Sequence, residues 1–556
     1  MAAFDVVIVG SGASGGWAAK RLTEAGLRVA VLEAGRQLTN ADYREHVQAF
    51  ELKYRAKTKR PLARQRPVQS ISYAVREWNS SWFVNDIDEP YVDESDPKFF
   101  WVRPRLVGGR TNVWGRESLR ISDLEFKAAS HDGHGVDWPI SYKDVEPYYD
   151  LVEEYIGVQG MTEGLPGLPD GKFQPPMAMT CSEVALRKRV KSALGRTITI
   201  GRTANLTKGI NGRAACHYCG PCERGCVTRS YFNSALTTVP DAIATGRCTH
   251  VPNAMVYKVL VDSDKGRATG LLYIDRVTRE AKEIRGRAVV LCAQALESVR
   301  ILFNSATRQH PHGLANSSGV LGHYLMDHLT GGGAWGDFEE AADKPSLANP
   351  QRPNGIYVIR FRNPKAGPRD KRFLRGYGFQ GGGDSGFNWR AAGFGAEYKK
   401  ALMQPVTTLG LGGFAECLAR FENYVEIDPS GQADVFGIPI LKIHMNWSEN
   451  EKALLLDMAE TAAEMLDAAG VKQIGTYAEA SVPGYGIHEV GVARMGADPK
   501  KSVLNAFQQT HDVKNLFVMD GSGFTSSACQ NPTLTIMALT VRSTDYLLGE
   551  MKRGNL

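Results

Sequence analysis

Residues 4–35 read FDVVIVGSGASGGWAAKRLTEAGLRVAVLEAG, and this stretch decides the fold class. The apolar run 6–9 predicts a buried strand, and the glycine-rich stretch 10–15 follows it as a tight turn. An alanine-rich helix is expected from about 15 to 25, and a second apolar strand at 29–32. Strand, helix and strand in this order predict the first unit of an α/β fold with a parallel sheet.

The turn has the spacing Gly10-x-Gly12-x-x-Gly15, which is typical of a dinucleotide site. Gly10 allows the tight turn, Gly12 lets the backbone approach a pyrophosphate, and Gly15 lets the helix pack closely on the strand. The start of the helix, which includes Ser14, offers free N–H groups and a positive dipole end to the phosphates. Glu33 ends the second strand, where a carboxylate accepts hydrogen bonds from a ribose and repels a 2′-phosphate. We therefore predict a dinucleotide other than NADP, and the motif alone does not separate FAD from NAD.

The chain has 556 residues, 43% of them hydrophobic and 23% charged, which is typical of a globular enzyme with two substantial domains. Its formal net charge of +6 is spread along the chain, so no nucleic-acid partner is expected. No apolar run approaches the roughly 18 residues of a bilayer span, and a strand pattern begins near the N-terminus. Neither a direct membrane span nor a signal peptide is therefore expected.

Two further stretches make the chain resemble the glucose–methanol–choline (GMC) oxidoreductases, which are FAD enzymes. Residues 105–115 read RLVGGRTNVWG, like the family's loop around the flavin. The C-terminal section contains residues 515–521, NLFVMDG, and residues 530–535, QNPTLT. The resemblance implies that Val256 meets the adenine through its backbone. The flavin-binding residues that it implies elsewhere are Gly109, Thr111, Asn112, Gly115, Asp520, Gly521, Pro532 and Thr533.

The resemblance also implies the domain organisation: an α/β chain, α+β overall, in which a Rossmann-like FAD-binding domain is interleaved with a substrate-binding domain built on an antiparallel sheet. The FAD-binding domain is expected at residues 1–45, 205–325 and 485–556. The substrate-binding domain and its cap segments are expected at residues 46–204 and 326–484. Within the latter, Ser448 and Glu451 fit a capping box at the start of a helix. Substrate contacts are expected in the same region, with Asn388, Trp389 and Glu416 as candidates.

The family's chemistry uses a histidine paired with a second histidine or an asparagine, and the matching positions are His488 and Asn531. Oxidation of an alcohol requires removal of the hydroxyl proton and transfer of the carbinol hydrogen as hydride to the flavin. A neutral imidazole is suited to take the proton near pH 7, whereas asparagine can only hold the hydroxyl by a hydrogen bond. The resemblance thus makes His488 the base and Asn531 the positioning group. His323, His328 and His511 have no such support and are interpreted as structural or surface residues.

Residues 216–226 read CHYCGPCERGC, which places four of the nine cysteines in a short loop expected at 213–230. Cys216, Cys219, Cys222 and Cys226 have the spacing C-x2-C-x2-C-x3-C of bacterial ferredoxin-type ligands. Val227 stands where two-cluster ferredoxins carry a proline. The four thiolates could therefore hold one [4Fe–4S] cluster, or three of them a [3Fe–4S] cluster. Structural zinc is the alternative, because zinc also accepts four thiolates.

Family members with a cluster are dehydrogenases that pass electrons to a cytochrome c or haem subunit. The cysteine loop and the following residues 230–234, SYFNS, are similar to those of bacterial FAD and iron–sulfur sugar dehydrogenases, above all glucoside 3-dehydrogenases. The resemblance implies oxidation of the C3 hydroxyl of a glucoside to a 3-keto sugar. It also implies a small subunit that carries the export signal, and hence a periplasmic location, with a cytoplasmic one as the alternative.

Other hypotheses stay open at this point. The chain could be a glucose, gluconate or polyol dehydrogenase of the same family, or an oxidase that gives the electrons to oxygen. A redox-silent member such as a lyase is a further alternative, as is a binding or scaffold protein whose cysteines hold zinc.

Overall fold

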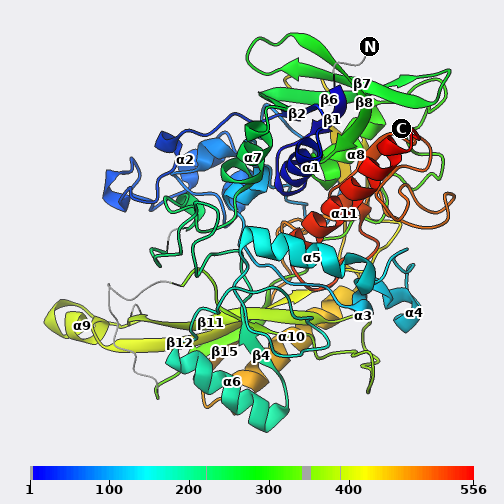
Figure 1. The fold of residues 1–556 in the computed structure, drawn as a ribbon. Coiled ribbons are helices and arrows are strands. Elements are labelled where there is room, and N and C mark those ends of the chain that lie inside the picture. Colours follow the sequence, from blue (N-terminus) through cyan, green and yellow to red (C-terminus); the bar gives the residue numbers. More distant parts are fainter. Residues whose placement is uncertain (1–3, 221, 341–351, 389) are drawn as a thin grey trace.

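The computed structural model describes residues 4–220, 222–340, 352–388 and 390–556. Two large sheets and the helices around them form the fold (Figure 1). The helices are α1 (Ala13–Glu24), α2 (Arg60–Ala63), α3 (Asp123–Phe126), α4 (Ala128–Asp132), α5 (Tyr142–Ile156), α6 (Cys181–Leu194), α7 (Thr238–Ala244), α8 (Ala295–Asn304), α9 (Gly395–Leu402), α10 (Glu449–Ala468) and α11 (Thr533–Lys552).

The strands number β1 to β16 in chain order. They are β1 (Phe4–Val9), β2 (Val29–Glu33), β3 (Val92–Asp93), β4 (Ile198–Ile200), β5 (Cys248–Pro252), β6 (Ala254–Asp262), β7 (Arg267–Asp275), β8 (Ala281–Leu291), β9 (Gly332–Asp337), β10 (Ile356–Val358), β11 (Tyr377–Phe387), β12 (Pro405–Ala415), β13 (Tyr424–Ile427), β14 (Leu441–His444), β15 (Lys472–Ala478) and β16 (Leu516–Val518).

The first sheet is the α/β sheet that the N-terminal stretch predicts. Its parallel part has the order β5-β2-β1-β8-β16. The first half of β8 also pairs with β7, and β7 with β6, as an antiparallel extension of the same sheet. Val6, Val7 and Ile8 of β1 are fully buried, as expected of a central strand covered on both faces. The predicted fold class is therefore confirmed.

Helix α1 follows β1 after the glycine turn and begins at Ala13, two residues earlier than the pattern predicts. It packs against α7 and α11. A methyl group on Gly15 would lie 1.9 Å from the carbonyl oxygen of Gly10, and one on Gly16 would lie 2.1 Å from Oγ of Ser234. Only glycine permits this approach of helix, turn and neighbouring segment.

The second sheet is antiparallel throughout, in the order β15-β9-β12-β11-β10-β4. Its hairpin β11–β12 reaches far from the rest of the chain and carries α9 at its tip (Figure 1). Helix α10 packs on β9, β12 and β15. Methyl groups on Gly332 and Gly413 would lie 3.0 Å or less from side-chain atoms of Met458, so these glycines let the helix approach the sheet closely.

The predicted start of α10 is confirmed. The backbone N–H of Ser448 donates to Oε2 of Glu451 at 2.7 Å, and Oγ of Ser448 accepts from the N–H of Asn450 at 3.3 Å. This is a capping box, which satisfies N–H groups that the first turn of a helix leaves without partners. The boundaries proposed for the two domains stay predictions. Strands of the first sheet come from residues 4–33, 248–291 and 516–518, and those of the second from residues 198–478.

Helices α5 and α11 lie between the two sheets and pack against each other (Figure 1). A small third sheet has the order β13-β14-β3. Among the helices of the described residues, none combines the length and apolar character that a bilayer crossing requires.

The packing at Gly15 leads to a test of the α/β unit. Gly15→Ala is expected to destabilise the fold by about 1–3 kcal/mol, because overpacking forces the backbone apart. Thermal unfolding followed by circular dichroism should show a melting temperature lower by about 1 °C for each kcal/mol, since the entropy of unfolding grows with chain length. Gly386→Ala on β11 is the control, since a methyl group there meets no atom within 4 Å. Equal melting temperatures for both variants would contradict the close packing at Gly15.

Candidate active site

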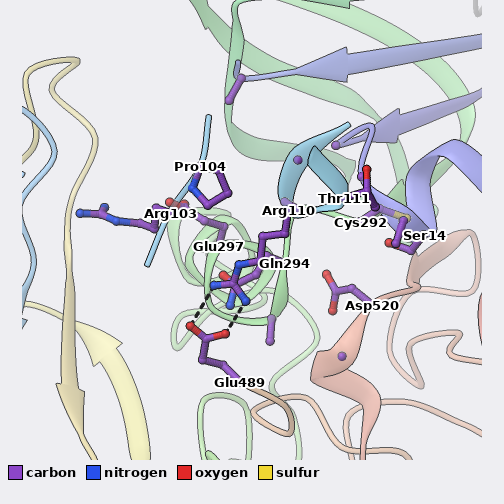
Figure 2. A pocket seen from close by; sticks show the side chains of 18 of the residues that line it. Ser14, Arg103, Pro104, Arg110, Thr111, Cys292, Gln294, Glu297, Glu489 and Asp520 are labelled. Carbon is purple, nitrogen blue, oxygen red and sulfur yellow. Dashed lines mark hydrogen bonds and ion pairs between the residues drawn. The ribbon is translucent and has the colours of Figure 1, made fainter. Parts of the chain in front are cut away.

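A cavity lies where the parallel strands β1, β2 and β8 end, which is where open α/β sheets bind their ligands. Its unfilled volume is about 1270 Å³, including its opening to solvent. Figure 2 shows Ser14, Thr111 and Asp520, from three segments remote in sequence, around the same space. The predicted ligand residues in its lining are Gly10, Gly12, Ser14, Glu33, Gly109, Thr111, Val256, His488, Asp520, Gly521, Pro532 and Thr533.

The N-terminus of α1 faces this cavity. Gly12 is its N-cap, no side chain caps the first turn, and no acidic residue lies there. The free N–H groups and the positive end of the helix dipole are thus available to an anionic group. Gly15 is not part of the lining among the described residues, and it serves the close packing of α1 on the turn instead.

Glu33 holds the glycine turn in place. Its Oε2 accepts hydrogen bonds from the backbone N–H of Ser11 at 3.0 Å and from Oγ of Ser11 at 2.8 Å, and its Oε1 accepts from the N–H of Gly35 at 2.7 Å. The side chain is buried at the end of β2 and lines the cavity. Its predicted contact with a ribose stays a prediction, and the bonds to Ser11 add a structural role.

A second glycine turn lies directly against the first. The N–H of Gly108 donates to Oγ of Ser11 at 3.0 Å, and a methyl group on Gly109 would lie 3.5 Å from Cα of Gly12. Thr111 lines the cavity and accepts from the N–H of Ser234 at 3.0 Å. The two turns together form one wall of the cavity.

Asn112 stabilises this loop from within. Its Nδ2 donates to the carbonyl oxygens of Val107 at 3.0 Å and Gly109 at 2.9 Å, and its Oδ1 accepts from Nδ2 of Asn233 at 2.9 Å. Within the described part of the chain the cavity lining does not include it. The structure thus gives Asn112 a role in shaping the loop.

An ion pair joins this loop to the segment 486–490, which carries His488. Arg110 donates from Nη2 to Oε1 of Glu489 at 2.9 Å and from Nη1 to Oε2 at 2.5 Å, as the dashed lines in Figure 2 show. The same guanidinium donates to the carbonyl oxygens of Val102 and Ile487. Since the Glu489 carboxylate is fully buried, the bidentate pairing also compensates its desolvation.

Two polar side chains that follow the neighbouring strands β16 and β8 complete the cavity. Asp520 accepts from Oγ of Ser298 at 2.5 Å and from the N–H of Ser522 at 3.0 Å, while burial raises the pKa of its carboxyl. Gln294 also lines the cavity (Figure 2), and its buried Nε2 has no hydrogen-bond partner among the described residues. Such an unpaired donor fits a polar ligand, because a buried N–H without an acceptor is costly.

His488 stands where this cavity meets a smaller one of about 590 Å³. Asn531, Trp114 and Gly115 line the smaller cavity, and His488 lines both. Nδ2 of Asn531 lies 3.2 Å from Nε2 of His488. The structure thus brings together the two residues predicted as the catalytic pair, although 42 residues of chain separate them.

Enclosure by protein keeps His488 neutral. Burial is the main cause that lowers its pKa well below the usual 6.5, and the neighbouring His328 and Arg110 lower it further. The backbone N–H of His488 donates to Oδ1 of Asp327 at 2.9 Å, and that of Gly486 donates to Oδ2 at 3.1 Å. Burial raises the pKa of Asp327 to about 7. The segment before His488 is therefore anchored on one buried carboxyl group.

Three side chains that the sequence does not single out belong to the site. Nδ1 of His328 lies 2.9 Å from Nδ1 of His488, so His328 is buried beside the predicted base and is not a surface residue. Nε2 of Gln380 on β11 donates to Oδ1 of Asn531 at 2.7 Å. Glu117 lines the smaller cavity; burial raises its pKa to about 8, and its Oε2 has no hydrogen-bond partner in the described chain. No spacing or motif signals these residues, because their segments meet only in the folded chain.

The residues suggested for substrate contact lie elsewhere or outside the described residues. Glu416 is buried in ion pairs with Arg375 and Arg360. Asn388 follows β11, eight residues beyond Gln380, which at about 3.3 Å per residue places it roughly 26 Å further along the hairpin. Trp389 is outside the described residues. The site instead receives Gln380 from this sheet.

The cysteine segment lies beside the loop that shapes the cavity. Tyr231, which follows it, donates from its hydroxyl to the carbonyl oxygen of Asn112 at 3.1 Å. Backbone N–H groups donate to two of the sulfur atoms, from Tyr218 to Cys216 at 3.4 Å and from Ser230 to Cys226 at 3.2 Å. N–H groups directed at sulfur are typical of thiolate sites.

The four thiols are close enough to influence one another. Burial raises the pKa of Cys222 to about 11, and the negative charges of Cys216, Cys219 and Cys226 contribute to this increase. Cys219 is exposed at the surface. Among the described residues, which exclude Pro221, no three His, Cys, Asp or Glu side chains are arranged to hold a metal ion. The donor set therefore fits a cluster in kind, and its described arrangement is not that of a closed metal site.

Comparison with known proteins agrees with this geometry. Models of the GMC oxidoreductase family match residues 4–330 and residues 419–540. The chain is 30% identical to 2-methyl-1,2-propanediol dehydrogenase of Mycolicibacterium austroafricanum, over 98% of this chain and 95% of that one. It is 26% identical to the fructose dehydrogenase large subunit of Gluconobacter japonicus, over 99% and 98%.

Among solved structures, the fold is similar to that of pyridoxine 4-oxidase from Mesorbium loti, with a TM-score of 0.60 at 17% identity over 98% of each chain. The family models cover more than half of the chain, and both matched parts contribute residues to the cavity. The chain therefore belongs to the GMC oxidoreductases, as a FAD-dependent enzyme that acts on CH–OH groups.

Proposed function

We propose that the chain is the catalytic subunit of a dehydrogenase that oxidises a secondary alcohol of a sugar or glycoside, at C3 of a glucoside, to the keto sugar. The observation that carries this proposal is the position of His488. It lies at the junction of the cavity that fits the dinucleotide and the smaller cavity that is open to a substrate. FAD, when bound, supplies the acceptor for the hydride that leaves the carbinol carbon.

FAD would be held by the chain's own groups in an arrangement that the cavity supports. The free N–H groups of α1 are suited to the pyrophosphate, and Glu33 at the end of β2 is suited to the ribose. Asp520, Gly521, Pro532 and Thr533 belong to the same lining, and Pro532 directly follows Asn531 in the chain. We propose these residues, together with Gly109, Thr111 and Val256, as the FAD site.

His488 would take the hydroxyl proton of the substrate at Nε2, and Asn531 would hold the hydroxyl oxygen in place. The low pKa of His488 keeps its ring neutral at neutral pH, so one ring nitrogen is free to accept a proton. Gln380 fixes the amide of Asn531 through its oxygen, so the Nδ2–H group points toward His488 and the substrate. A positioned general base of this kind contributes roughly 10² to 10⁴ to the rate.

A sugar substrate is supported by two observations. The fructose dehydrogenase large subunit, similar over nearly the whole chain, acts on a sugar by its name. The carboxyl of Glu117 and the guanidinium of Arg116 line the smaller cavity and offer hydrogen bonds to several hydroxyl groups. The similarity to a diol dehydrogenase favours a small polyol as the second candidate substrate.

We further propose that Cys216, Cys219, Cys222 and Cys226 hold one iron–sulfur cluster, as [4Fe–4S] or [3Fe–4S]. The spacing of the four thiols and the N–H groups directed at their sulfur atoms support this. A cluster would supply one-electron transfer toward an external acceptor, which we propose to be a cytochrome c or a haem subunit. The relative named as a large subunit supports a further proposal, a small partner that exports the chain to the periplasm.

The role of His488 is tested by anaerobic stopped-flow reduction of the bound flavin. His488→Ala is expected to lower the rate by about 10² to 10⁴ while FAD stays bound, because the general base is lost. His511→Ala is the control, since His511 contacts Oγ of Ser502 at 3.0 Å and lines neither cavity among the described residues. An unchanged rate in His488→Ala would remove it from the mechanism.

The same rate should show the low pKa of His488. A base acts only when it is unprotonated, so a lowered pKa extends the active range toward acid. The wild-type rate is therefore expected to stay level from about pH 8 to about pH 6.5 and to fall only at lower pH. A fall centred near pH 6.5 would show an ordinary histidine at this position.

The substrate is tested by the anaerobic absorption spectrum before and after addition of a sugar. Methyl glucoside is expected to bleach the flavin bands, and its 3-deoxy analogue, which lacks the reacting hydroxyl, is not. Bleaching by both sugars would move the reaction to another carbon, and bleaching by 2-methyl-1,2-propanediol alone would favour the diol candidate. Faster reoxidation by oxygen than by an artificial dye would identify an oxidase.

Metal analysis tests the cysteine segment. The purified protein should contain about three or four iron atoms per chain and matching acid-labile sulfide. Serine replacements of the four cysteines, one at a time, are expected to lower the iron content in at least three cases, and Cys248→Ser is the control outside the segment. Zinc without iron would contradict the cluster and leave the flavin chemistry untouched.

A further inference from the structure

A second histidine lies behind His488, on the side away from Asn531. Nδ1 of His328 is 2.9 Å from Nδ1 of His488, and Nε2 of His328 is 3.0 Å from the carbonyl oxygen of Ala528. We propose that His328 is a positioning residue that fixes the tautomer of His488, so that the lone pair of its Nε2 faces the substrate. This inference rests on the proposed role of His488 as the base.

The tautomers follow from the contacts of His328. A backbone carbonyl oxygen only accepts hydrogen bonds, so Nε2 of His328 carries a proton and donates to Ala528. A neutral imidazole has one N–H group, so Nδ1 of His328 is the acceptor. The facing Nδ1 of His488 must then donate, and Nε2 of His488 is left with its lone pair.

The contact between Asn531 and His488 leads independently to the same tautomer of His488. Nδ2 of an asparagine amide only donates, so its contact with Nε2 of His488 at 3.2 Å requires a lone pair on that nitrogen. The orientation of this amide is in turn fixed, because Oδ1 of Asn531 accepts from Nε2 of Gln380 at 2.7 Å. The other tautomer of His488 would place two lone pairs 2.9 Å apart at His328 and two N–H groups face to face at Asn531.

The surroundings of His328 keep it neutral, as the scheme requires. Its side chain is 1% exposed, and the ring of Phe414 packs at 6.4 Å from it and at 6.2 Å from His488. Burial lowers the pKa of His328 to about 4. A charged His328 would lose its acceptor and repel the proton that His488 must receive.

Paired backbone holds the two histidines in register. Met326 and Val490 exchange two hydrogen bonds, each 3.0 Å long, so the segments that carry His328 and His488 run antiparallel side by side. Asp327 accepts from the N–H groups of Gly486 and His488. The distance between the two rings is therefore set by main-chain geometry, and a positioning group held on such backbone loses little entropy when it acts.

When the substrate is oxidised, its hydroxyl proton moves to Nε2 of His488, and the resulting imidazolium still donates from Nδ1 to His328. His328 accepts this stronger, charge-assisted bond without moving a proton of its own. His328 would thus act both before the transfer, by selecting the tautomer, and after it, by accepting from the cation. Among the described residues, His328 lines neither of the two cavities, so its effect passes through His488.

Three replacements of His328 separate these roles. In His328→Asn the amide oxygen takes the place of Nδ1 and preserves the acceptor for His488. His328→Gln preserves only a donor toward Ala528, and His328→Leu preserves neither. Anaerobic stopped-flow reduction with a sugar that bleaches the wild-type flavin gives the rate of flavin reduction and the substrate Kd separately, and FAD content with thermal unfolding reports on the fold.

We expect His328→Asn to stay within about tenfold of the wild-type rate, and the Gln and Leu variants to fall by about 10² at an unchanged Kd, since the base then lacks the acceptor that selects its reactive tautomer and stabilises its imidazolium. Gln or Leu at the wild-type rate, or Asn as slow as Leu, would overturn the inference. These outcomes leave the proposed function standing if His488→Ala is slow. A wild-type rate in His488→Ala would instead remove the proposed function itself.

A measurement on the unaltered protein covers the case in which these variants do not fold. Nitrogen NMR of protein labelled at its histidine nitrogen atoms distinguishes protonated from unprotonated ring nitrogens. The signals that disappear in His488→Gln are expected to show a protonated Nδ1 and an unprotonated Nε2. A protonated Nε2 at neutral pH would overturn the inference.

Discussion

The shape of the larger cavity depends on the contact between two glycine turns. Gly12 and Gly109, from segments almost a hundred residues apart, lie in van der Waals range: a methyl group on Gly109 would lie 3.5 Å from Cα of Gly12, and one on Gly12 would lie 4.0 Å from the carbonyl oxygen of Gly108. Ser11 joins them, because it donates to Glu33 and accepts from the N–H of Gly108. The two turns form one wall of the cavity at the ends of the parallel strands. The flavin is proposed to lie on this wall.

Burial decides the chemistry on the other side of that cavity. A charge enclosed by protein is costly, so His488 and His328 stay neutral, and the carboxyl of Asp327 titrates near neutrality. Arg110 pairs with the buried carboxylate of Glu489 through two hydrogen bonds, which compensate its desolvation. The result is a base that is neutral in the resting state and therefore able to accept a proton.

The second sheet has a direct part in this site. Gln380 on β11 orients Asn531, and Phe414 on β12 covers both histidines. The cysteine segment reaches the opposite side through Tyr231 and the loop that contains Asn112. The loop 108–112 thus contacts the segment 486–490, which carries His488, and Tyr231, which follows the cysteine segment. The regions proposed for the flavin, the substrate and the exit of electrons therefore meet at these two segments. Changes in the second sheet can therefore affect His488 without touching the lining of the larger cavity.

The sequence by itself determined the elements whose signals are local. The spacing of Gly10, Gly12 and Gly15 predicts the turn, since backbone sterics admit only glycine at Gly10 and Gly15, and the capping box at Ser448 predicts the start of α10. The family resemblance brought His488 and Asn531 together before any coordinates, and the structure has them in contact. Only the tertiary structure decided that His328, Gln380 and Glu117 belong to the site and that Glu416 does not. The physical reason is that a hydrogen bond between segments depends on where strands pair and how deeply side chains are buried, and neither is encoded in the spacing of neighbouring residues.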